Sequence, residues 1–165
     1  MTLRIIGDSH GKNDRTSEKY YHEQARVESR TYLSILADAK QKGVEHTLQI
    51  GDIGWRKDLE CMKDINPEFH KVLYGNHDDY DNVLPHSIGD YGIITHGGVE
   101  FGFFRGENSI DKERRITHSE IKKFGKTWWD QEEMSYQKMQ EAIDFFAGRK
   151  LELFVSHGAP DFLIE

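Results

Sequence analysis

The sequence is poor in cysteine and in long apolar runs, and each shortage excludes a class of protein. It holds a single cysteine, Cys61, so no disulfide can form within the chain, which fits a reducing compartment. No stretch approaches the roughly 20 apolar residues that cross a bilayer, and the N-terminus begins without an apolar signal segment. We therefore expect a cytoplasmic protein with no membrane partner.

Positive charge is also in short supply. Lysine and arginine number 22 against 29 acidic residues, which gives a net charge of −7. This balance argues against a general nucleic-acid-binding surface. It does not exclude a phosphorylated substrate, because a metal ion would bring its own positive charge. A chain of 165 residues folds as one compact domain by default, so we expect residues 1–165 to form a single domain.

Short apolar runs alternate with helical patterns in the first half of the chain. Residues 3–6, 46–50 and 69–74 are rich in β-branched and apolar side chains, which predicts strands. A helical spacing that ends at Gly43 lies between the first two, and a short helix at 58–63 would precede the third. This alternation predicts a parallel sheet with helices on its faces.

The pattern changes in the second half. Two apolar runs flank His96-Gly97-Gly98, which predicts a hairpin, whereas the charged stretch 108–127 is expected to be irregular. The remaining elements expected there are strands at 91–95, 99–104 and 151–155 and a helix at 131–147. The predicted fold class is therefore α/β, with mixed β-sheet layers flanked by helices.

Four of the predicted strands end in polar groups beside glycine. These groups are Asp8, His10, Asp52, Asn76, His77 and His157. Each motif alone has an ordinary explanation, because aspartate and asparagine initiate turns, and glycine and asparagine tolerate left-handed geometry. The carboxyl ends of strands in an open α/β sheet can converge, however. Mixed carboxylate, imidazole and amide groups suit manganese, iron or zinc better than an all-oxygen magnesium or calcium site.

The same motifs carry a family resemblance. Gly7-Asp8-Ser9-His10, Gly51-Asp52-Ile53-Gly54, Gly75-Asn76-His77-Asp78 and Ser156-His157-Gly158 resemble, in order and approximate spacing, the first four motifs of the calcineurin-like metallophosphoesterases, especially their small bacterial and phage members. The resemblance implies a metallophosphoesterase-like α/β sandwich and two divalent metal ions, with manganese favoured and iron or zinc as alternatives. It implies hydrolysis of a phosphomonoester or phosphodiester by a water that the metals activate.

The resemblance also assigns roles to individual residues. Asp8 and His10 would bind the first metal, Asp52 would bridge, and Asn76 and His157 would bind the second. His77 would face the substrate and protonate the leaving oxygen instead of binding metal. These roles make a phosphorylated substrate the expected partner.

Two arginines are candidates for substrate binding. Arg56 lies four residues after Asp52, where the serine/threonine phosphatase branch of the family has a phosphate-binding arginine. Arg105 follows a predicted strand, and pairing with nearby acids is its alternative role. The segments 105–112 and Trp128-Trp129 are expected to rim the site.

Two departures from the family pattern bear on these roles. Trp55 stands where the phosphatase branch has an aspartate that orients the catalytic histidine, which leaves Asp78 and Asp79 as candidates for orienting His77. The family's fifth motif, Gly-His-x-His, does not follow before the last residue. The remaining histidines are each more typical of surface or core residues than of ligands, and His96 is the least implausible substitute among them.

The missing motif leaves three explanations open. The sequence is a fragment of a longer protein, a partner or second copy covers an exposed C-terminal side, or the chain has lost catalysis. The alternative to a phosphoesterase is therefore a non-catalytic interaction scaffold on the same fold, or an inactive fragment.

Overall fold

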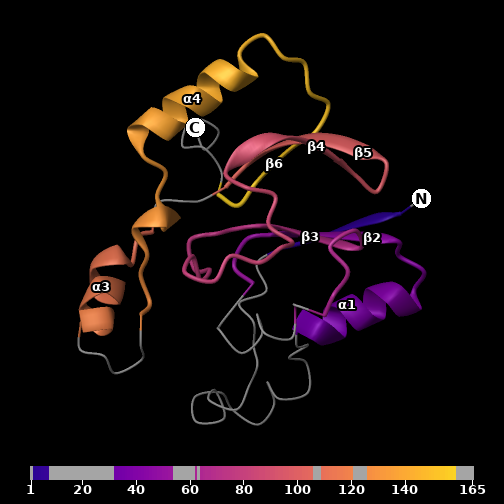
Figure 1. Cartoon of the computed structure of the whole chain (residues 1–165), viewed down its shortest axis with the longest axis horizontal. Coiled ribbons are helices and arrows are strands. Elements are labelled where there is room, and N and C mark those ends of the chain that lie inside the picture. The colour runs from indigo at the N-terminus through magenta and orange to yellow at the C-terminus, as the bar shows by residue number, and fades with distance from the viewer. Residues whose placement is uncertain are drawn as a thin grey trace.

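The structure is a computed structural model of the chain, and it describes residues 2–7, 32–53, 62, 64–105, 109–120 and 126–158. Figure 1 shows how its helices and strands are arranged. In chain order they are β1 (Leu3–Ile6), α1 (Tyr32–Gln41), β2 (His46–Ile50), β3 (His70–Leu73), β4 (Tyr91–His96), β5 (Val99–Phe104), α3 (Lys112–Glu120), the 3₁₀ helix η3 (Asp130–Glu132), α4 (Tyr136–Phe146) and β6 (Phe154–Ser156).

The first sheet has the order β1-β2-β3, and both pairs are parallel, as the alternation of runs predicts. Helix α1 lies along one face of this sheet (Figure 1). The core on that side includes Ile6 of β1, Leu36 of α1 and Val72 of β3, each at most 7% exposed. Burial of this apolar surface holds the helix against the sheet.

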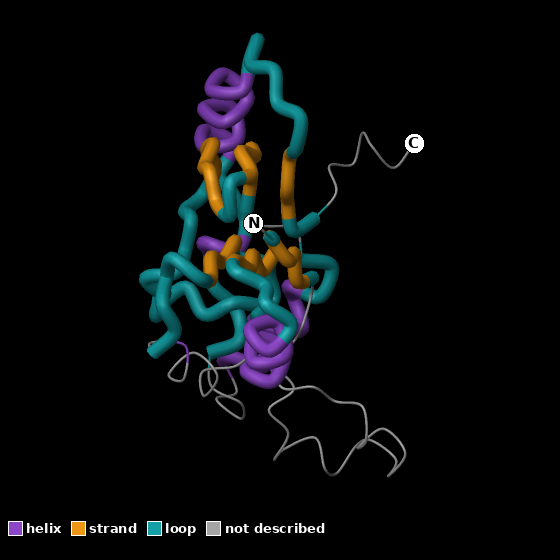
Figure 2. The backbone as a smooth tube through the Cα atoms, turned by 90° about the vertical axis from the view of Figure 1, so that its right-hand side faces the viewer, coloured by secondary structure: helices purple, strands orange, loops and turns teal. Residues whose placement is uncertain are grey.

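The second sheet has the order β4-β5-β6. The predicted hairpin is confirmed, because β4 and β5 are antiparallel, whereas β5 and β6 are parallel, so the sheet is mixed. Leu48 and Leu73 of the first sheet share a buried cluster with Phe101, Phe103 and Val155 of the second. The two sheets therefore face each other across a common core, and Figure 2 shows them as stacked layers.

Helix α4 lies on the far side of the second sheet (Figure 1). The ring of its Phe145 lies 5.7 Å from Tyr91 of β4, and that of Phe146 lies 5.2 Å from Phe154 of β6. Edge-to-face packing of this kind stabilises a helix on a sheet. The result is an α/β fold in which two sheets are flanked by helices. No helix among the residues described is long and apolar enough to cross a membrane.

Three expectations for the second half differ from the structure. The strand expected at 151–155 is shorter and covers Phe154–Ser156. The stretch 108–127, expected to be irregular, contains helix α3. The helix expected at 131–147 begins only at Tyr136, because the Ser135 side chain accepts a hydrogen bond from the Lys138 N–H and caps it there. Residues 130–132 instead form η3, which buries Glu132 completely.

Candidate metal centre

The ends of β2 and β3 bring two of the sequence motifs together. Ile50 pairs with Leu73 in register, so the loops that follow these strands start side by side. Left-handed backbone occurs in the loop after β2, at Gly51 with φ +87° and Asp52 with φ +49°. A non-glycine residue in this region is under strain, and such strain is commonly found at functional sites.

Gly75 is needed for space. A Cβ atom at this position would lie 2.4 Å from Asp52 Oδ1 and 2.8 Å from His157 Nε2. A Cβ atom at Gly51 would lie 2.0 Å from His157 Nδ1. Any larger residue at either position would push aside a group that the resemblance assigns to the metals.

The Asp78 carboxylate ties the two loops together. It accepts backbone N–H bonds from Asp52 at 3.0 Å, Ile53 at 2.6 Å and Gly75 at 2.7 Å. Burial raises the pKa of Asp78 to about 7, although the N–H donors of Gly75 and Ile53 act in the opposite direction. The contacts shown for Asp78 are thus to the backbone of the loops, and its role as a candidate for orienting His77 stays a prediction.

Three acceptor atoms meet where the loops approach β6. His157 Nε2 lies 3.0 Å from Asn76 Oδ1 and 3.3 Å from Asp52 Oδ1. The other ring nitrogen, Nδ1, lies 3.0 Å from the Ile50 carbonyl, which only accepts, so Nδ1 carries the proton. Nε2 can then face two oxygens only if it takes a second proton or if a cation lies among the three atoms.

This arrangement fits a metal by its donor chemistry. A metal-binding histidine commonly donates its second ring N–H to a backbone carbonyl, which leaves the other nitrogen free to coordinate. Carboxylate oxygen, amide oxygen and imidazole nitrogen are ligands that suit manganese, iron or zinc. Three of the five ligands that the resemblance implies, Asp52, Asn76 and His157, are thus in one place.

Asp52 is the most confined of the three. It is 2% exposed, and its Oδ1 also accepts the backbone N–H of His77 at 2.9 Å. Burial by itself raises the pKa of Asp52, but the contact with His157 and the hydrogen bond from the His77 backbone N–H outweigh it and hold the pKa below its usual range. The group is therefore ionised at neutral pH and ready to hold a cation.

The remaining predicted ligands, Asp8 and His10, lie outside the described residues, as does Arg56. Gly7, the last described residue before Asp8, accepts a hydrogen bond at its carbonyl from Gln49 Nε2 at 2.9 Å. Within the described ranges, no group of three or more histidine, cysteine, aspartate or glutamate side chains is arranged to hold a metal ion. The three convergent donors include the amide of Asn76, which such a group does not contain.

His77 lies beside these donors and keeps its imidazole partly open to solvent, with 29% of the side chain exposed. Its Nε2 lies 3.9 Å from Asp111 Oδ1, which is longer than a hydrogen bond. Asp111 belongs to the 105–112 segment that was expected to rim the site. Whether Asp79 orients His77 stays a prediction.

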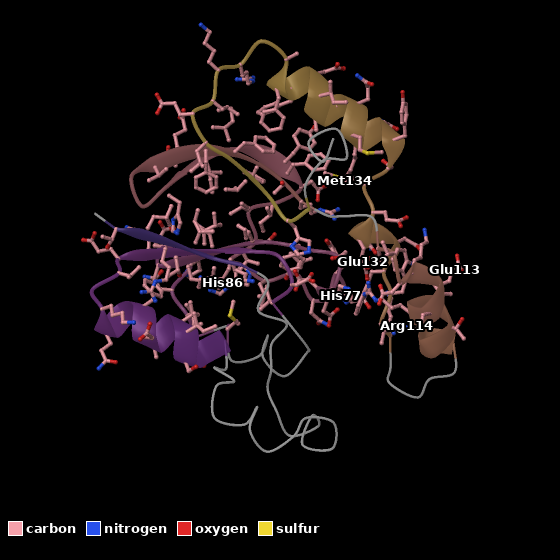
Figure 3. All side chains as sticks on the ribbon, turned by 180° about the vertical axis from the view of Figure 1, so that it is seen from behind. His77, His86, Glu113, Arg114, Glu132 and Met134 are labelled. Carbon is pink, nitrogen blue, oxygen red and sulfur yellow. The ribbon has the colours of Figure 1, made fainter. Side chains whose placement is uncertain are left out.

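A second group of residues reaches Asn76 from α3 and η3. Asn76 Nδ2 donates to Ser109 Oγ at 2.7 Å, and the backbone carbonyl of Asn76 accepts a hydrogen bond from Arg115 Nη1 at 2.9 Å. Arg115 in turn pairs with Glu132, which Figure 3 shows on the same side of the molecule as His77. Sequence reasoning missed Arg115 and Glu132, and no motif or spacing links them, because they come from separate elements.

Arg105 takes the alternative role left open for it. It is 7% exposed, its guanidinium pairs with Asp90 and donates to the Tyr80 hydroxyl at 3.1 Å, and it stacks on the Tyr80 ring at 4.9 Å. Its substrate-binding role stays a prediction. Trp128 and Trp129 are 9% and 5% exposed, so the expectation that they rim the site is wrong.

His96 does not substitute for a missing ligand. Its Nε2 lies 3.0 Å from the carbonyl of Thr47, near the start of β2, whereas the donors gather after the end of that strand. His96 and the candidate ligands therefore lie at opposite ends of β2.

Comparisons with known proteins add no family. No family model matches the chain, and no match was found among curated proteins. The resemblance therefore rests on the motifs themselves and on the meeting of Asp52, Asn76 and His157.

Proposed function

We propose that the chain is a metal-dependent phosphoesterase that hydrolyses a phosphomonoester or phosphodiester on a metallophosphoesterase-like α/β sandwich. One observation carries the proposal: His157 Nε2 lies 3.0 Å from Asn76 Oδ1 and 3.3 Å from Asp52 Oδ1, while the His157 Nδ1 proton is committed to Ile50. A cation bound among these three atoms would satisfy all of them. The partly open His77 beside it supplies a group that can transfer a proton.

The residues that would hold two divalent ions are Asp8, His10, Asp52, Asn76 and His157, with manganese favoured. When bound, the ions would supply Lewis acidity toward a phosphoryl oxygen and a nucleophile from water. Asp52 contributes the negative charge, and its confinement by the loop backbone keeps it in one position. Asn76 and His157 contribute neutral donors of fixed orientation, because each has its other polar atom bonded elsewhere.

His77 acts as the proton donor to the leaving oxygen. Its backbone is fixed by the N–H bond to Asp52 Oδ1, while its ring remains accessible. General acid catalysis of this kind contributes about 10²- to 10⁴-fold to a rate. Asp111 is near enough to help hold the ring in place.

The test is turnover of two chromogenic esters by protein loaded with manganese. p-Nitrophenyl phosphate reports monoesterase activity, and bis-p-nitrophenyl phosphate reports diesterase activity. We expect Asp52→Ala to lower the rate by orders of magnitude, because it removes both a ligand and the charge that holds the cations. His77→Ala should lower kcat by about 10²-fold or more and leave manganese affinity nearly unchanged.

Asp64→Ala is the matched control, because Asp64 is exposed and precedes β3, at the opposite end of that strand from the site. It should retain full activity. Undiminished turnover in the Asp52→Ala protein would rule out the proposed mechanism.

The second candidate is a non-catalytic interaction scaffold. Helix α4 favours it with apolar side chains on its outer side: Tyr136 is 78%, Met139 is 39% and Ile143 is 62% exposed. A partner could cover this surface. Manganese bound at about two ions per chain together with ester turnover would exclude a purely structural role.

A further inference from the structure

The Asn76 side chain has one contact at each end of its amide, and the two ends differ because Oδ1 accepts hydrogen bonds and Nδ2 donates them. Oδ1 lies 3.0 Å from His157 Nε2, and Nδ2 donates to Ser109 Oγ at 2.7 Å. An amide turned over by half a rotation would aim its N–H groups at His157 and its oxygen at Ser109. That amide could not help to bind a cation, because an NH₂ group donates and has no lone pair to offer.

The partners of Ser109 determine which way the amide lies. Ser109 Oγ lies 3.3 Å from Arg115 Nη1 and 3.4 Å from Glu132 Oε2. A guanidinium only donates and a carboxylate only accepts. The single hydroxyl proton of Ser109 is therefore directed to Glu132, and its lone pairs remain for the N–H groups of Arg115 and Asn76.

Arg115 and Glu132 are themselves held rigidly. Two parallel bonds of 2.7 Å join the guanidinium to the carboxylate, and Glu132 also accepts the Trp129 N–H at 3.0 Å. Glu132 is 0%, Ser109 5% and Arg115 6% exposed, so water does not compete for these bonds. Bidentate pairs of this kind fix geometry as well as charge.

We propose that Ser109, oriented by the Arg115–Glu132 pair, is a positioning residue that fixes the Asn76 amide with Oδ1 toward Asp52 and His157. The inference rests on the proposed function in one respect, which is that Asn76 binds metal. Groups that orient metal ligands from outside contribute about 10- to 100-fold to metal affinity. Ser109 acts through Asn76 and touches neither metal nor substrate.

The first experiment measures manganese affinity by calorimetry at pH 8. Burial raises the pKa of Glu132 to about 7 despite the opposing Arg115 contacts, so this carboxyl is ionised at that pH. Ser109→Ala should weaken manganese binding about tenfold or more, and Ser109→Thr, which keeps the hydroxyl, should restore it. Ser87→Ala is the matched control, since the bond shown for the Ser87 side chain is a local one, accepted from Gly89 N–H at 3.3 Å.

The second experiment needs no metal. In ¹⁵N-labelled apo protein, the Asn76 side-chain NH₂ resonance can be assigned by its loss in Asn76→Ala. We expect slow exchange of these protons with water in the wild type and in Ser109→Thr, and markedly faster exchange with a shifted resonance in Ser109→Ala. Thermal unfolding of the apo proteins shows whether Ser109→Ala remains folded.

The outcomes separate the two proposals. If the wild type binds manganese and Ser109→Ala binds it equally well, the positioning role is wrong while the phosphoesterase proposal stands. If the wild type binds no manganese, the phosphoesterase proposal fails, and the Asn76 resonance alone decides the positioning role. An unchanged resonance and unchanged exchange in Ser109→Ala would overturn that role in either case.

Discussion

At the scale of single residues, the candidate site depends on two glycines, which have no side chain to fill the space beside the ligands. Gly51 and Gly75 leave room for His157 and Asp52, which could not otherwise approach each other. The sequence places a glycine beside each candidate ligand, but from the sequence alone such a glycine indicates only a turn. That a glycine after β2 makes room for a histidine after β6 depends on the tertiary fold.

Gly51→Ala should therefore lower manganese affinity in addition to the unfolding free energy that its backbone strain costs. The new Cβ would lie 2.0 Å from His157 Nδ1 at φ +87°, so the imidazole must leave its bond to Ile50. Gly89→Ala is the matched control, because Gly89 has φ +96° with nothing within 4 Å of an added Cβ. Both should lose about 1–2 kcal/mol of unfolding free energy to strain, but only Gly51→Ala should lose manganese affinity. Equal manganese affinities for the two variants would contradict this prediction.

At the scale of helices and strands, local patterns predicted what local forces determine. The strands at 3–6, 46–50 and 99–104 and the parallel first sheet follow from apolar runs and their alternation with a helical pattern. Helix α3 did not follow, because its sequence is strongly charged and, among the side chains described in it, Arg115 is the buried one. The site follows the same division: the ligands after β2, β3 and β6 could be read from motifs, whereas Glu132 could not.

The Asp78 side chain connects the loops that follow β2 and β3, and Asp78→Asn tests how much this connection stabilises the fold. An amide offers a single acceptor oxygen where the carboxylate serves three N–H donors, so at least one buried donor loses its partner. At pH 8 we expect a loss of about 2 kcal/mol or more in unfolding free energy. Hydrogen exchange at the amides of Asp52, Ile53 and Gly75 should accelerate.

Asp79→Asn is the comparison for this substitution. Asp79 is also buried, but the bonds shown for it are to Asp81 N–H and Asn82 Nδ2 within the following turn. Asp79→Asn should lower the unfolding free energy by less than Asp78→Asn does, and it should leave amide hydrogen exchange at the end of β2 unchanged. Equal losses from both substitutions, with no change in exchange, would show that Asp78 does not join the two strands.

At the scale of the whole molecule, Thr47 is a point where the two sheets meet. Its carbonyl lies 3.0 Å from His96 Nε2, from the hairpin of the second sheet, and its hydroxyl lies 2.7 Å from His70 Nδ1 of β3. Burial, together with the nearby His86 and His96, lowers the pKa of His70 to about 3. Figure 3 shows His86 on the α1 side of the first sheet. The junction of the layers thus contains an imidazole that resists protonation.

Acid should weaken the fold at this junction. Below pH 6.5 the unfolded chain binds a proton at His70 while the folded chain does not, so stability is present above that pH and is lost as the pH falls toward 3. The expected loss is about 1.4 kcal/mol for each pH unit. His70→Asn, which keeps a polar atom for Thr47 without a titrating ring, should remove this slope even if it lowers stability at pH 7.

Urea unfolding of the wild type and of His70→Asn at pH 7, 6 and 5 measures the difference. The raised pKa values of Asp78 and Glu132, both about 7, act in the opposite direction, because their contribution is present at low pH and is lost as the pH rises toward 7. That contribution is common to both proteins and cancels in the difference between their curves. Parallel curves from pH 7 to pH 5 would mean that His70 takes up a proton in the folded protein, and that the junction of the two sheets is not the acid-sensitive part of the fold.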